Sequence, residues 1–69
     1  MSLKFAQYQR IRIVADRFAA ESVPRGSIGY IIECYQDGAY EVEMSNPETG
    51  ETVAAFIAND ADLEAAPEA

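Results

Sequence analysis

The chain of 69 residues contains no histidine and no tryptophan, and its single cysteine is Cys34. Without histidine, the side chain that most often serves as general base or metal ligand is absent. One cysteine cannot form an internal disulfide. Cys34 lies in the apolar run of residues 30–35, where a small buried hydrophobe is expected in place of a reactive thiol. The sequence therefore predicts a protein that is not an enzyme and that has no metal and no cofactor.

Cations are missing from most of the chain, since no lysine or arginine follows Arg25. Residues 1–25 hold all five cations against two acids, a net charge of +3, whereas residues 26–69 hold ten acids, a net charge of −10. An acidic surface repels nucleic-acid phosphates and anionic membranes and attracts basic proteins. We therefore expect a protein partner with a basic surface, and neither nucleic acid nor membrane. Simple solubility is the other explanation of the charge.

Long apolar runs are also missing. None approaches the roughly 20 residues of a membrane helix, and no long apolar stretch follows Lys4 as it would in a signal peptide. We therefore expect a cytoplasmic protein. The apolar fraction of 49% is sufficient for a packed core. One domain is predicted over residues 5–65, with residues 66–69 as a frayed tail.

What the chain does have is alternation of apolar and polar residues with period two, which indicates β-strands. Ile11 and Ile13, for example, alternate with arginines. Asp37-Gly38 between two β-rich runs predicts a hairpin, and Gly29 predicts a bulge or a tight bend. Five strands are expected, at residues 8–14, 28–35, 39–44, 52–58 and 63–65.

The connections between these strands are also predicted. Pro24 blocks a helix, so residues 15–25 are expected to form a long loop that tucks Phe18 or Val23 into the core. Residues 59–62 are expected to form one helical turn, with Asn59 or Asp60 as its cap.

The aromatic residues are divided between core and surface. We expect Tyr30, Tyr40 and Phe56 in the core and Tyr8, Tyr35 and Phe5 at the surface. Residues 53–57 are apolar on both faces, so the fourth strand is predicted to be central in the sheet or covered by the long loop.

A series of short motifs runs along the chain: Arg25-Gly26-x-x-Gly29, Asp37-Gly38, Tyr40-Glu41-Val42-Glu43, Gly50-Glu51-Thr52 and Asp62-Leu63. Their order and spacing resemble those of a family of small bacterial domains of unknown function, over nearly the whole chain from Phe5. The resemblance implies an all-β fold, a small SH3-like five-stranded barrel with a long first loop and one helical turn before the last strand. It implies no established activity. Members resemble proteins whose genes accompany those of toxins, which implies an immunity or antitoxin role.

Two candidate sites follow. SH3-like barrels bind ligands near the long first loop, so the resemblance places Tyr8, Phe18 and Tyr35 at a possible binding surface. A second site comes from the residues themselves: Glu41 and Glu43, with Glu33 across the hairpin, are expected to form an acidic cluster on one face of the sheet. Either Arg10 and Arg12 balance this cluster in an internal charge ladder, or the cluster docks a basic partner.

The acidic series Asp60-x-Asp62-x-Glu64 is a candidate calcium site only at first sight. A calcium loop supplies about six or more oxygen ligands over a longer span, with a glycine at its sharp turn. Capping and solubility explain these three carboxylates better, so no metal site is predicted.

The leading hypothesis is a non-catalytic protein-interaction module, in the form of an acidic immunity or antitoxin-type inhibitor docking on a basic protein. The first alternative is a structural, self-assembling small barrel that forms a homo-oligomer. The second is a nucleic-acid-associated KOW-like barrel, suggested by the Gly26 and Gly29 turn and opposed by the charge, since phosphate contacts need cations.

Overall fold

The computed structural model describes residues 4–46 and 48–67. Its five strands are β1 (Arg10–Ile13), β2 (Ile28–Cys34), β3 (Ala39–Ser45), β4 (Thr52–Asn59) and β5 (Leu63–Ala65). Two short 3-10 turns, η1 (Ala19–Glu21) and η2 (Asp60–Asp62), complete the regular structure. The expected all-β class, the long first loop and the helical turn before the last strand are confirmed. No helix in these described ranges is long and apolar enough to cross a membrane.

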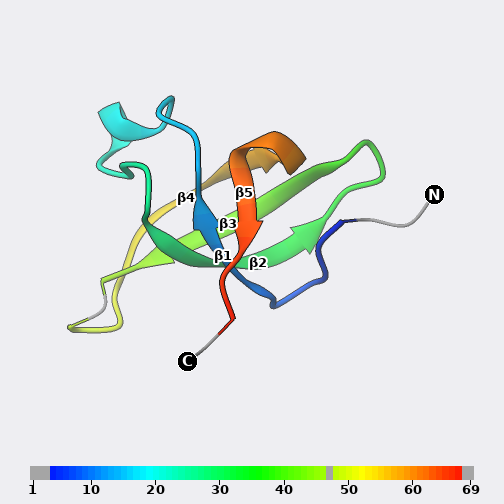
Figure 1. Cartoon of the computed structure of the whole chain (residues 1–69). Helices are drawn as coiled ribbons and strands as arrows, with labels where there is room; N and C mark the ends of the chain where they lie inside the picture. Colours follow the sequence, from blue (N-terminus) through cyan, green and yellow to red (C-terminus); the bar gives the residue numbers. More distant parts are fainter. Residues whose placement is uncertain (1–3, 47, 68–69) are drawn as a thin grey trace.

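All strand pairs are antiparallel, in the order β4-β3-β2-β1-β5. The sheet is strongly bent, so that β1 and β5 lie across β2 and β3 in a barrel-like arrangement (Figure 1). β1 begins two residues later than predicted because Tyr8 has φ 69°, a left-handed conformation that is incompatible with an extended strand.

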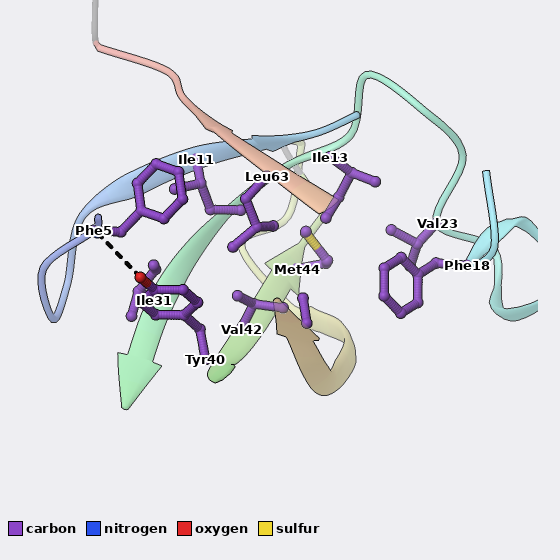
Figure 2. Close-up of a cluster of buried hydrophobic side chains, with 11 residues drawn as sticks. Phe5, Ile11, Ile13, Phe18, Val23, Ile31, Tyr40, Val42, Met44 and Leu63 are labelled. Carbon is purple, nitrogen blue, oxygen red and sulfur yellow. Dashed lines mark hydrogen bonds between the residues drawn. The ribbon is translucent and has the colours of Figure 1, made fainter. Parts of the chain in front are cut away.

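The core lies inside this bend. Ile11 and Ile13 of β1 and Leu63 of β5 face Val42 and the other inward residues of β2 and β3 (Figure 2). The predicted alternation of buried and exposed residues is confirmed in β1 and β3, where the inward residues are buried and their neighbours are half-exposed. Cys34 packs against the edge of this cluster as a partly buried side chain.

The long loop closes one end of the core. Phe18 and Val23 are both buried, and the Phe18 ring centroid lies 4.3 Å from that of Phe56 on β4. Arg17 holds the loop to η2, because its Nε donates to Oδ1 of Asp62 at 3.1 Å. Asp62 is buried and also accepts from the backbone N–H of Asn59 at 3.0 Å, which completes a capping box around η2.

Gly29 is not the bulge that we predicted. It pairs in regular register with Ile11 and Met44, and the register shift in β2 falls between Ile31 and Glu33. A Cβ on Gly29 would collide with Sδ of Met44 and would lie 2.6 Å from the carbonyl oxygen of Glu43. Glycine is therefore required here by close packing inside the bend.

Three predictions about exposure are wrong. Phe5 is buried, with its ring centroid 5.5 Å from that of Tyr40 and its N–H donating to the Tyr40 hydroxyl at 3.3 Å (Figure 2). Tyr30 is 39% exposed, because its position in β2 puts it on the face opposite Ile31. β4 is an edge strand and not a central one: the long loop contacts only its inner face, where Phe18 packs against Phe56, and its outward side chains are exposed.

The tail after β5 does not begin to fray at Ala66. Ala66 is fully buried, its N–H donates to the carbonyl of Arg10 at 3.1 Å, and its carbonyl accepts from Nη1 of Arg10 at 2.8 Å. Residues 68–69 of the predicted tail lie outside the described residues.

The hairpin turn yields a first prediction. Gly38 has φ 85°, and a Cβ there would meet only Asp60 Oδ2, at 3.8 Å. Gly38→Val should therefore lower the free energy of unfolding by about 1–3 kcal/mol through backbone strain and not through a clash. Gly38→Asn should cost less, because asparagine tolerates positive φ. Chemical denaturation measures both; equal stabilities of the two variants would contradict the turn assignment.

The loop anchor yields a second prediction. The hydrogen bond from Arg17 holds the pKa of Asp62 below its ordinary value, against the opposing effect of burial. A carboxyl with a lower pKa when folded stabilises the fold above its unfolded pKa of about 3.9, and this contribution is lost as pH falls through the folded pKa. Asp62→Asn should therefore cost about 1–3 kcal/mol at pH 7 and much less at the acid end. Denaturation at several pH values between 7 and 2 measures the difference; a constant cost would exclude the linkage.

Candidate protein-interaction face

The outer face of the β2-β3 hairpin carries the predicted acidic cluster. Tyr40, Val42 and Met44 of β3 are buried, so Glu41 and Glu43 between them point away from the core. The cluster of Glu33, Glu41 and Glu43, called the acidic cluster below, is brought together by the strand pairing. Glu33 is the direct cross-strand partner of Glu41, and Glu43 is the partner of Tyr30.

Neutral groups bond two of these carboxylates. The hydroxyl of Thr52 on β4 donates to Oε1 of Glu43 at 3.0 Å. The hydroxyl of Tyr35, at the end of the hairpin, lies at the long distance of 3.5 Å from Oε1 of Glu41. The pKa of Tyr35 is raised, first by partial desolvation and then by the negative charges of Glu41 and Glu33. A tyrosine therefore shares the electrostatic field of the acidic cluster.

The arginines of β1 do not balance the acidic cluster, so the internal charge ladder is not formed. Arg12 pairs with Glu64 on β5, on the other side of β1. Arg10 lies in the same sheet row as Tyr30 and Glu43, but its Nη1 donates to the carbonyls of Ala66 and Pro67.

The remaining cations are engaged elsewhere as well. Arg25 forms a two-bond pair with Asp16, at 3.0 and 3.1 Å, and Arg17 bonds Asp62. Lys4 Nζ lies 5.3 Å from the ring centroid of Phe5. Over residues 4–46 and 48–67, no cation forms an ion pair with the acidic cluster.

The predicted aromatic site is not assembled as one surface. Tyr8 is 71% exposed and Tyr35 is 40% exposed, as expected. Phe18, however, is buried, and Figure 2 shows it beside Val23 at the end of the core away from Phe5. Phe18 therefore supports the loop and offers no surface to a ligand.

An apolar strip beside the acidic cluster was missed by the sequence reasoning. Val53, Ala55 and Ile57 of β4 are exposed on the outer side of the sheet, and Ala55 and Ile57 are the cross-strand partners of Glu43 and Glu41. The alternation Val53-x-Ala55-x-Ile57 was the available signal. Tyr30 and Val53 also line a shallow depression between the loops around Ser27 and Asn46.

The three carboxylates at the end of the chain do not converge. Asp62 accepts a hydrogen bond from Arg17, and Glu64 pairs with Arg12. Asp60 lies beside the hairpin turn, with its Oδ2 3.8 Å from the position of a Cβ on Gly38. Within the described ranges, no three potential metal-ligating side chains form a group.

The chain belongs to a family of domains of unknown function, DUF4926, whose model matches residues 8–65. No curated protein matches the chain. No solved structure matches it either. Membership supports the expected relationship to a family without an established activity, and the site must therefore be interpreted from its own chemistry.

The field of the acidic cluster can be measured at Tyr35. Replacing Glu33 and Glu41 with glutamine should lower the pKa of the Tyr35 hydroxyl, because two nearby negative charges that oppose its ionisation are removed. Phenolate titration by nuclear magnetic resonance resolves Tyr35 from the other three tyrosines. Glu48→Gln in the exposed loop is the control and should leave the value unchanged. An unchanged pKa in the double variant would mean that the cluster does not act on this ring.

Proposed function

We propose that the protein is a non-catalytic protein-interaction module whose acidic cluster docks on a basic protein surface. The observation that carries this proposal is the engagement of all five cations elsewhere, in contacts with other acids, backbone carbonyls or a ring. An internal ladder would have explained Glu33, Glu41 and Glu43 structurally. Its absence leaves the charge of the acidic cluster for a partner.

The energetics favour a partner of opposite charge. Glu33 and Glu41 lie directly opposite each other, an arrangement of like charges that destabilises an antiparallel pair. A lysine or arginine of a partner would relieve this repulsion. It would also find Tyr35 and Tyr30 beside the carboxylates, and aromatic side chains are enriched in interface cores.

An immunity or antitoxin-type inhibitor in a bacterial cytoplasm is the form of this function that we favour. Such an inhibitor must recognise one protein rapidly, and a fixed cluster of one charge raises association rates by steering. The same negative field opposes the KOW-like alternative, because it repels the negatively charged phosphates of a nucleic acid.

Charge reversal tests the docking face. Glu41→Lys with Glu43→Lys should leave the fold intact and slow association with a basic protein by about tenfold or more. Binding of the wild-type chain should weaken as salt rises, because the screening length is about 8 Å at physiological ionic strength. Surface plasmon resonance against the proteins that the wild-type chain retains from a bacterial extract, and against a purified basic protein, measures both effects.

The matched control is Glu48→Lys with Glu51→Lys, which makes the same change in net charge at two exposed residues that are not members of the acidic cluster. Equal loss of binding in the two double variants would show a general charge effect and would sink the docking face. Retention of the wild-type chain on duplex DNA at physiological salt would support the nucleic-acid alternative in its place.

A further inference from the structure

The free edge of the sheet at β4 differs from the other strands in that it carries no charged side chain. β4 ends the strand order, and its eight residues, Thr52–Asn59, include no charge. Each of the other four strands carries at least one charged side chain. The chain has a net charge of −7, yet β4 is uncharged. Among the described residues, β4 is also the long strand that has a neighbour on one side only.

Exposed strand edges invite pairing with another chain, and native proteins usually block them with charges, proline or a very short strand. β5, at the other edge, is blocked in this way, since it has three residues and includes Glu64. β4 has only a register shift at Val53, opposite the Met44–Ser45 step, which leaves the following residues regular. Val53 and Ile57 are 55% and 50% exposed on its outer side.

We propose that β4 pairs antiparallel with β4 of a second copy of this chain, about a twofold axis at Ala55. This register sets Val53 opposite Ile57 on the outer side and Ala54 opposite Phe56 on the inner side. Both faces of the strand are then matched, apolar with apolar, and the two sheets become one continuous sheet. Cross-strand pairs of this kind are the unit of sheet stabilisation.

A second copy fits this edge better than a foreign strand. β4 carries no charge with which to select a basic partner, whereas its order of side chains is self-complementary about Ala55. Twofold pairing also consumes the long edge of both copies, so the assembly closes as a dimer and leaves only the short β5 edges. Ala54 and Phe56, which are partly buried in one copy, become further covered.

The proposal is independent of the docking function, and salt separates the two. Each copy carries a net charge of −7, so dimerisation opposes like charges and should strengthen as salt screens them. Docking of the acidic cluster on a basic partner should weaken over the same range of salt. Loss of one behaviour with retention of the other therefore identifies which proposal has failed.

The primary experiment is sedimentation equilibrium of the whole chain from low micromolar to roughly millimolar concentration, at low and high salt. We expect a monomer–dimer equilibrium that shifts toward dimer with concentration and with salt. A monomer at every concentration and salt would overturn the proposal. Species that grow beyond a dimer would also overturn it, because the β4 edge closes after one pairing.

Two double variants with the same loss of apolar surface test the register. Val53→Lys with Ile57→Lys places like charges opposite each other twice across the axis and should raise the dimer dissociation constant at least about tenfold. Val53→Glu with Ile57→Lys differs only in the charge at position 53 and places opposite charges there, so it should restore the dimer at low salt. Ile57 neighbours Glu41 on β3, so a lysine at position 57 is tolerated within one copy in both variants.

Equal dimerisation of the two variants would exclude this register.

Amide hydrogen exchange of the wild-type chain provides a test that needs no variant to fold. Backbone N–H groups of β4 that have no partner in one copy should exchange more slowly as concentration rises. The exchange of backbone N–H groups of β5, at the other edge of the sheet, should not change. Protection that is independent of concentration would exclude β4 as the contact.

Discussion

The inward packing of β3 determines where the other strands and the acidic cluster lie. β3 is paired on both sides, with β2 and with β4, and its residues Tyr40, Val42 and Met44 form the floor of the core. Because side chains of a strand alternate between its faces, burying these three fixes Glu41 and Glu43 on the outside. A slip of one residue would bury both carboxylates, which is prohibitively costly without partners. The core therefore positions the acidic cluster.

The bend of the sheet sets the second constraint, since it brings β1 and β5 over β2 and β3 (Figure 1). Gly29 permits this closeness, because any side chain there would collide with Met44. The bend also decides where the cations are used. Arg12 finds Glu64 on β5, Arg10 finds the carbonyls after β5, and Arg17 reaches η2. These arginines thus bond groups of β5, its flanking residues and η2, and do not bond the acidic cluster.

These two constraints produce two different surfaces on adjoining strands. The hairpin of β2 and β3 presents unbalanced negative charge, and β4 presents a neutral edge with exposed aliphatic side chains. The first surface suits a rapid, salt-sensitive encounter with a basic protein. The second suits backbone pairing, which depends on register and not on charge. A dimer through β4 would place two acidic clusters on one continuous sheet and so present two docking faces to partners.

Local sequence patterns were sufficient to predict the presence and order of the strands, the hairpin turn, and which residues of β1 and β3 face the core, because periodicity and positive-φ glycines act within a few residues. Ile11, Ile13, Glu41, Glu43 and Gly38 all behave as these local rules require. Long-range packing set the remaining features: the edge position of β4, the burial of Phe5, the need for glycine at position 29, and the partners of the arginines. Those outcomes depend on contacts between residues far apart in the chain, such as Arg12 with Glu64 and Phe18 with Phe56, and no local pattern encodes which distant partners will meet.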